Sequence, residues 1–220
     1  MKKVHLFIWL TAAISSAFAQ ADEFRVTTLR AAPGQLEHLI KDVQAYRDEK
    51  SGKVIIMRHS QGDHWDLLLL ESTGKDFGGG KDFGHLVNFQ HGFLASSDSS
   101  FSQLHEDSAS SDLYHIEMFH ALAGKKQALL NQRQRENQYL QATGQTTNAV
   151  FSTEFGSDVD VFTIGFHADM TAFAKGPTVS DSAAETAAKN AGFKNRADLG
   201  FYLRSLLTSH QDTLAVPVGN

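Results

Sequence analysis

The sequence predicts an α+β fold in which two tandem β-α-β-β units occupy one chain and pack their sheets face to face. Two observations support this prediction. The order of strand-like and helical patterns repeats at an offset of about 90 residues, and the first half contains one strongly amphipathic helix pattern between a strand and a hairpin. At 220 residues, the chain is long enough to bury a sizeable core.

Two segments of the first half align with two segments of the second half. Residues 24–34 (FRVTTLRAAPG) match residues 114–124 (YHIEMFHALAG), and each run is strand-like and ends at a glycine before a helical pattern. Residues 62–67 (GDHWDL) match residues 156–161 (GSDVDV), each a turn between two apolar runs. The second offset is slightly larger than the first, so we expect a longer helix or loop in the second half and an unchanged order of elements.

In the first half, a helix is predicted from about residue 35 to 49 because its apolar residues fall on one stripe. These residues are Leu36, Leu39, Ile40, Val43 and Tyr46. Residues 54–59 and 65–71 then form a predicted hairpin around Gly62, since glycine readily adopts the positive φ of a tight turn.

The second half repeats this order, with a strand at 114–121, a helix from about 125 to 141, and a hairpin of 148–154 with 159–167. The shared order β-α-β-β is that of a ferredoxin-like unit.

After each hairpin, the sequence predicts a glycine-rich stretch, a further helix and a short final strand. A third match, of residues 105–108 (HEDS) with residues 210–213 (HQDT), supports this weakly, and chance similarity is the alternative. We assign the first unit to residues 20–110, with its glycine-rich loop and tail helix, and the second unit to residues 111–220, with a C-terminal helix.

Residues 28–37 (TLRAAPGQLE), with the hairpin that follows, resemble the opening of the dimeric α+β barrel superfamily, particularly its NIPSNAP-like and stress-responsive members. In that family two ferredoxin-like sheets pair face to face, so the resemblance implies that this chain is a tandem, fused form of such a dimer. The family includes monooxygenases, haem-degrading enzymes, isomerases, lyases and proteins without a known activity. The fold therefore does not select a reaction.

The first nineteen residues have the pattern of a secretory signal peptide. Lys2 and Lys3 form the positive end, residues 4–14 are apolar, and Ala17-Phe18-Ala19 is a small-x-small cleavage site. We expect cleavage after Ala19 and export to the periplasm or the medium, with an uncleaved anchor as the alternative. No later apolar run approaches the roughly 20 residues that a membrane-spanning helix needs, so the mature chain is expected to be soluble.

Composition narrows the range of partners and chemistries. The formal net charge is −5 and no Lys/Arg cluster is present, so we expect neither nucleic acid nor a membrane surface as a partner. The chain contains no cysteine, which excludes disulfides, thiolate nucleophiles and thiolate metal sites. Residues 74–82 (GKDFGGGKD) lack the spacing of a phosphate-binding loop, and no GxSxG motif is present.

Alternate residues of a strand share a face, so His115, Glu117 and Phe119 lie on the opposite face from the residues between them. Those intervening residues, at 114, 116, 118 and 120, are more apolar, and we predict that they face the helices. The first set would then face the barrel interior, together with its counterparts in the first half, Arg25, Thr27 and Leu29.

His115 and Glu117 are the candidate catalytic pair. A histidine and a carboxylate two residues apart are suited to act as a general base with its orienting partner, or to supply two ligands to a divalent metal. The alternative is a hydrogen-bonded strand histidine without a role. His64 and His167 lie in or beside predicted strands and are further ligand-binding candidates, but no compact ligand pattern appears and we expect no metal site.

The predicted second helix has polar residues where the first has apolar ones. Gln132, Arg133 and Glu136 occupy an inward stripe, where such side chains must be paired, hydrated or used. We favour the alternative that the helix register differs by one residue. Apolar side chains such as Leu129 and Tyr139 would then face inward and the charges would face solvent.

The leading hypothesis is an exported small-molecule-binding barrel whose pocket lies between the two sheets, with residues 78–84 as a lid and an unknown cofactor and ligand. One alternative is a cofactor-independent enzyme of the same fold, of monooxygenase, isomerase or lyase type, that uses His115 and Glu117 as acid and base. Another is an assembly module with a filled barrel. A homo-oligomer is compatible with each of them.

Overall fold

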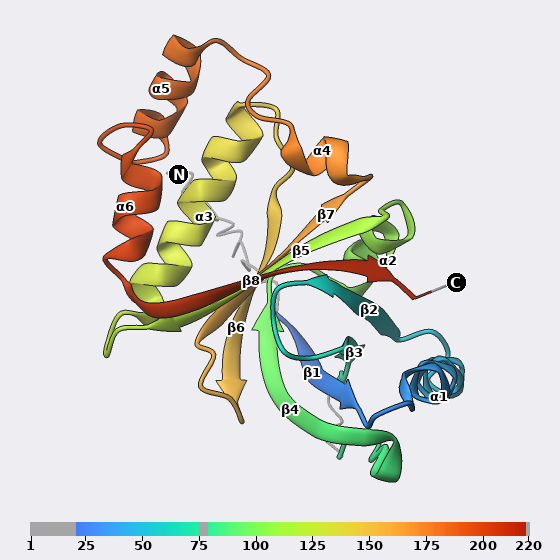
Figure 1. Ribbon diagram of the computed structural model, residues 1–220. Coiled ribbons are helices and arrows are strands. Elements are labelled where there is room, and N and C mark those ends of the chain that lie inside the picture. The colour runs from blue at the N-terminus through green and yellow to red at the C-terminus, as the bar shows by residue number, and fades with distance from the viewer. Residues whose placement is uncertain (1–20, 75–78, 219–220) are drawn as a thin grey trace, which may run out of the picture.

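The computed structural model describes residues 21–74 and 79–218 and shows an α+β fold around one closed sheet (Figure 1). The predicted signal peptide, residues 1–19, lies outside the described residues, as does part of the predicted lid. No helix in the described part of the chain combines the length and apolar character needed to cross a membrane.

The first half follows the predicted order β-α-β-β and then adds a strand and a helix. Its elements are β1 (Asp22–Ala31), α1 (Leu36–Glu49), β2 (Val54–Gln61), β3 (Leu67–Ser72), the short 3-10 helix η1 (Gly84–Leu86), β4 (Val87–Ser97) and α2 (Phe101–Ala109).

The second half begins with the same order. Its elements are β5 (Leu113–Ala121), α3 (Lys126–Ala142), β6 (Asn148–Phe155), β7 (Val161–His167), α4 (Met170–Ala174), α5 (Asp181–Asn190), α6 (Asp198–Arg204) and β8 (Leu207–Pro217). The longer second helix, with 17 residues in α3 against 14 in α1, accounts for most of the difference between the two repeat offsets.

The end of the first half differs from the prediction, which placed a helix before the final strand. In the first half the final strand β4 precedes the helix α2, whereas in the second half the helices α4, α5 and α6 precede β8. Residues 105–108 therefore lie in a helix and residues 210–213 in a strand. The third sequence match was a chance similarity and does not relate equivalent positions.

The described strands close into one barrel in the order β1-β3-β2-β8-β5-β7-β6-β4, and all neighbours are antiparallel. Each half contributes four adjacent strands, and the pairs β2–β8 and β4–β6 join the halves. Closure leaves no unpaired strand edge within this sheet. The prediction of two ferredoxin-like halves in one intramolecular barrel is confirmed.

Gly62 shows why a glycine is needed at the seam between the halves. Its φ is 120°, and a Cβ at this position would lie 2.2 Å from the carbonyl oxygen of Asp212 and 2.8 Å from the Cα of Thr213. Any side chain here would push β8 away from the β2–β3 turn.

Apolar side chains fill the barrel interior. All eight strands contribute to one buried cluster, which includes Phe24, Met57, Leu68, Phe93, Ile116, Phe151, Phe162 and Ala215. Phe151 and Phe162 stack with their ring centroids 4.4 Å apart, and Leu104 of α2 joins the cluster. An eight-stranded barrel is just wide enough for side chains to fill, so the interior is a packed core.

The prediction of which strand face looks inward was wrong. Tyr114, Ile116 and Met118 belong to the interior cluster, whereas Phe119 packs against α3 and α6 on the outer face. In the first half, Leu29 likewise packs against α1. Figure 1 shows α1 on one side of the barrel and α3, α5 and α6 on the other. The more apolar set of residues faces inward because the closed interior excludes water from every side, which a helix covering an outer face does not do.

Packing of the interior gives a direct test. The Phe162→Ala variant is expected to lose about 3–5 kcal/mol of unfolding free energy, since it leaves a cavity among stacked rings. The Phe155→Ala variant is its control, because Phe155 is 77% exposed near the end of β6. Urea denaturation followed by circular dichroism measures both. Equal, small losses in the two variants would contradict a packed interior.

Candidate functional site

A polar row crosses the outer face of the second half. In the strand registers, Glu117 of β5 is paired with Thr163 of β7 on one side and with Asp212 of β8 on the other. Phe119 is paired in the same way with His210. Residues paired across antiparallel strands project to the same face, so these side chains gather on one outer surface, beneath α3.

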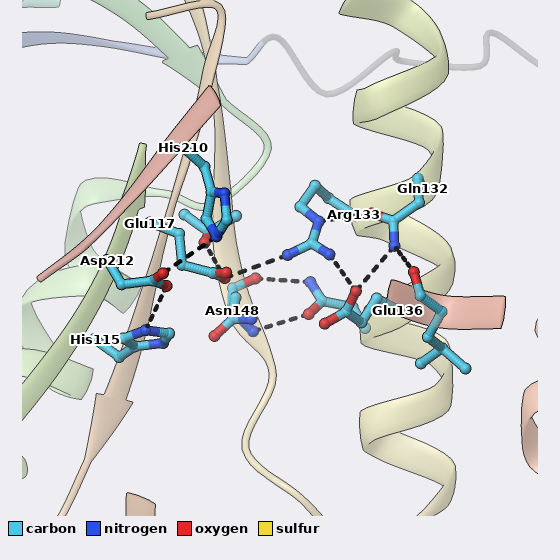
Figure 2. Close-up of polar contacts among 11 residues, drawn as sticks. His115, Glu117, Gln132, Arg133, Glu136, Asn148, His210 and Asp212 are labelled. Carbon is cyan, nitrogen blue, oxygen red and sulfur yellow. Dashed lines mark hydrogen bonds and ion pairs between the residues drawn. The ribbon is translucent and has the colours of Figure 1, made fainter. Parts of the chain in front are cut away.

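Two histidines flank Asp212 (Figure 2). The Nε2 atom of His115 is 3.3 Å from Asp212 Oδ1, and the Nε2 atom of His210 is 3.2 Å from Asp212 Oδ2. His210 also stacks on the ring of Phe119, with an interplanar angle of 14°. We call His115, Glu117, His210 and Asp212 the histidine–carboxylate cluster.

Arg133 of α3 holds Glu117 in place from above. Its Nη1 donates to Glu117 Oε2 at 3.2 Å, and Thr163 Oγ1 donates to the same oxygen at 3.2 Å. The other side of the guanidinium contacts Glu136 and its plane lies over Phe119, 4.9 Å from the ring centroid. A side chain that is only 2% exposed thus has its charge paired with two carboxylates.

The predicted register shift of the second helix was wrong. Gln132 and Arg133 are fully or almost fully buried, and they line the inner side of α3 together with Leu129 and Tyr139. Burial is tolerated because the polar groups bond to one another: Gln132 Nε2 donates to Glu136 Oε2 at 3.0 Å, and Arg133 Nε donates to Gln132 Oε1 at 2.7 Å. The polar stripe is an inward-facing network.

Two ionisable groups, one in this network and one beside it, have shifted pKa values. Burial raises the pKa of the Glu136 carboxyl above its usual range, although the charge of Arg133 opposes the shift. Burial, and to a smaller extent the nearby His115, lowers the pKa of the His167 imidazole. The site therefore favours a neutral His167 and a carboxyl at Glu136 that holds its proton more tightly than an exposed glutamate.

A groove of about 410 Å³ opens next to the cluster, between β5, β7, α4 and the C-terminal part of α3. We call it the α3–α4 groove. Its lining includes His115, Glu117, Glu136, Leu140, Gln145, Asn148, His167, Ala172, Phe173 and Lys175.

The ring of Phe173 is 5.0 Å from that of His115 and 5.2 Å from that of His167, so these three rings form one wall of the groove. Gly165 leaves room for this wall, since a Cβ there would lie 2.9 Å from His167 Nε2.

Comparison with known proteins bears on the fold. No protein-family model and no curated protein matches the sequence. Among solved structures, an anthrone oxidase-like protein matches with a TM-score of 0.57 at 10% identity, over 91% of this chain and 94% of that chain. A putative monooxygenase from Lactobacillus acidophilus matches with a TM-score of 0.52 at 7% identity, over 91% and 95% of the two chains. A mutant chlorite dismutase from Candidatus Nitrospira defluvii matches with a TM-score of 0.51 at 11% identity, over 90% and 93%.

The chain has the dimeric α+β barrel fold. The matches cover nearly the full length of both chains, so the likeness extends over both ferredoxin-like halves. At such low identity it concerns the fold alone, and the chemistry of this α+β barrel has to be argued from its own residues.

The α+β barrel brings only some of the predicted site residues together. His115, Glu117 and His167 line the α3–α4 groove, and Phe119 lies buried beside them under Arg133. The remaining four are elsewhere. Arg25 and Thr27 line a smaller cavity of about 240 Å³ on the first half, Leu29 is buried under α1, and His64 packs against Phe89 with ring centroids 5.3 Å apart.

Several members of the site were not predicted. Asp212, His210 and Phe173 join it only through the β5–β8 pairing and the fold of α4, which the sequence pattern did not specify. One signal was present: the second half contains both His115-x-Glu117 and His210-x-Asp212. Two neighbouring strands with this alternation place all four side chains on one surface when their register pairs Glu117 with Asp212.

The role of Arg133 can be tested through stability. The Arg133→Met variant leaves Glu117 and Glu136 as largely buried carboxylates without their cation, so we expect a loss of about 3 kcal/mol in unfolding free energy. Arg135→Met, which changes an exposed arginine of the same helix, is the control. Urea unfolding at neutral pH measures the unfolding free energy of both variants. A loss in Arg133→Met no larger than that in Arg135→Met would contradict a stabilising role of Arg133 between the two carboxylates.

Proposed function

We propose that this protein binds a small polar organic molecule in the α3–α4 groove. One observation carries the proposal: ionisable side chains from three separate elements converge on a concave surface that also has an aromatic wall. Glu117 comes from β5, Glu136 from α3 and His167 from β7. The volume of the groove is in the lower part of the range of roughly 300–1,000 Å³ that small-molecule sites occupy.

The lining defines the class of ligand. The rings of Phe173, His115 and His167 offer a wall against which a planar group can pack. The carboxylates of Glu117 and Glu136 in the same lining accept hydrogen bonds from hydroxyl or ammonium groups, and the exposed Lys175 suits a negatively charged substituent. We therefore expect a planar molecule that carries hydroxyl or amino groups and at most one acidic group.

The corresponding surface of the first half is arranged differently. There Tyr46 OH donates to Glu71 Oε2 at 2.8 Å, and Arg25 and Lys50 pair with the same carboxylate at 3.3 and 3.1 Å. Phe83 packs edge-on against Tyr46 and covers this cluster. The α3–α4 groove is thus not repeated in the first half, where Arg25 and Thr27 line a smaller cavity of about 240 Å³.

Acid–base catalysis is the second candidate function. It is favoured by Glu136, whose pKa burial raises and which lines the same groove as the imidazole of His115. The Glu136→Gln variant separates the two candidates: an enzyme loses turnover and keeps its affinity, while a binding protein has no turnover to lose.

We further propose that the chain is exported and is related to the NIPSNAP-like and stress-responsive barrels. Export is supported by the lysine pair, apolar stretch and Ala17-Phe18-Ala19 site at the start of the sequence. The kinship is supported by the strand, Pro33-Gly34 turn and helix of residues 28–37.

Edman sequencing of the protein recovered from expressing cells is expected to begin at Gln20, and an intact Met1 would contradict export.

Blocking the groove tests the proposed function. Ala172 lines the groove, and Ala174 lies exposed on the same helix, α4. The protein and the variants Ala172→Trp and Ala174→Trp are incubated with a small-molecule extract of the cells, washed and denatured, and the released compounds are identified by mass spectrometry.

A compound retained by the unmodified protein and by Ala174→Trp, but at least about tenfold depleted in Ala172→Trp, is the expected result. Equal unfolding midpoints of the two variants show that the fold is intact. Identical compound profiles in all three proteins would contradict binding in the groove.

A further inference from the structure

We propose that His115, Glu117 and Asp212 bind one first-row divalent metal ion at the edge of the α3–α4 groove. One ligand atom from each of these residues lies within 4.8 Å of the others. This inference goes beyond the proposed binding of an organic molecule, because it adds a second ligand at a neighbouring position and depends on Asp212, which the groove does not need.

The strand register creates the site. Glu117 and Asp212 are direct partners across β5 and β8, and His115 lies two residues before Glu117 on the same face. Two atoms bound to one ion at about 2.0–2.2 Å, at tetrahedral angles or in adjacent octahedral positions, are about 2.8–3.6 Å apart. The observed 3.3 Å between His115 Nε2 and Asp212 Oδ1 satisfies this requirement, so an ion can replace the hydrogen bond between them.

The charges favour a cation. Like charges placed directly opposite each other in an antiparallel pair are destabilising, and Glu117 faces Asp212 in this way. Arg133 does not balance them, because its guanidinium is shared between Glu117 and Glu136. Asp212 is instead partnered by His115 and His210 (Figure 2). A divalent ion between Glu117 and Asp212 would compensate these two facing negative charges.

The neighbours of the ligands already hold them in position. Glu117 uses Oε2 to accept from Arg133 and Thr163, and its other carboxylate oxygen has no hydrogen bond among the described residues. Asp212 presents Oδ1 to His115 while Oδ2 faces His210, whose ring is fixed by stacking on Phe119. Each carboxylate therefore has one oxygen held by a neighbour and one available to a metal, the arrangement of outer-shell support found around metal ligands.

The donor set indicates which metal fits. One imidazole nitrogen with two carboxylate oxygens suits zinc, manganese, iron or cobalt in the divalent state, while calcium and magnesium prefer oxygen alone. Three protein ligands leave coordination positions for water or for a donor atom of a bound molecule. Asp212 is about half exposed, so an ion can enter from solvent.

Metal titration of purified protein tests the inference. The protein is stripped with a chelator, returned to chelator-free buffer, and titrated with Zn²⁺ and separately with Mn²⁺ by calorimetry, with bound metal counted by mass spectrometry. We expect one ion per chain, and at least about tenfold weaker binding in Asp212→Asn and Glu117→Gln. His210→Gln, which removes outer-shell support alone, is expected to weaken binding by about tenfold.

The pair His120 and Asp158 provides a matched control. These side chains lie 3.8 Å apart on the same barrel, but no third ligand joins them among the described residues, so Asp158→Asn is expected to bind the metal as the unmodified protein does. Absence of stoichiometric Zn²⁺ and Mn²⁺ binding, or equal affinity in Asp212→Asn and Asp158→Asn, would overturn the inference. No organic ligand takes part in the titration, so its outcome is independent of whether the groove retains a compound.

Discussion

Closure of eight strands into a barrel filled by aromatic and aliphatic side chains decides where the polar residues of the sheet lie. A packed interior has no room for a ligand and no solvent for a charge, so strand residues that carry charge must project outward. On the outer face they meet the helices. The chemistry of this protein is consequently built between sheet and helix, and the proposed small-molecule site lies there instead of between the two sheets.

The two halves use that outer face differently. At the place where α1 has Val43 and Tyr46, α3 has Arg133 and Glu136, each 90 positions further along the chain. In the first half Arg25, Lys50 and Tyr46 all bind the Glu71 carboxylate, and Phe83 packs against Tyr46. In the second half the buried Arg133 instead pairs with Glu117, and the α3–α4 groove opens beside them. A duplicated scaffold can thus keep one half for stability and use the other for a site.

The internal repeat predicted the β-α-β-β order of both halves, because repeated order and hydrophobic periodicity reflect local structure that each segment specifies by itself. Closure into a barrel was implied by the resemblance to the dimeric α+β barrels. Which face of β5 lies inside the barrel could not be predicted in the same way. Alternation separates His115 and Glu117 from Ile116 and Met118, but it does not say which set is inside, and both faces of this strand are covered. The residues at 114, 116 and 118 were correctly identified as the more apolar set. They were wrongly expected to face the helices, whereas they face the barrel interior.

Other parts of the site depend on contacts between distant segments. Asp212 reaches Glu117 only through the register of β8 against β5, and three helices separate β8 from the rest of its half. The polar stripe of α3 was visible in the sequence, yet its burial is explained only once Glu117 is seen opposite Arg133. Sequence periodicity identifies a candidate residue, whereas its partners come from the tertiary fold.

Because the chain has no native cysteine, single cysteines can report directly on which face of β5 is outside. The decisive measurement is the rate at which a water-soluble maleimide labels the His115→Cys and Ile116→Cys variants in the folded state. His115 lines the groove and Ile116 is completely buried in the barrel, so His115→Cys is expected to react in the native protein and Ile116→Cys only after unfolding. Faster native labelling of Ile116→Cys would show that the polar face is turned inward, and a site beneath α3 would then be untenable.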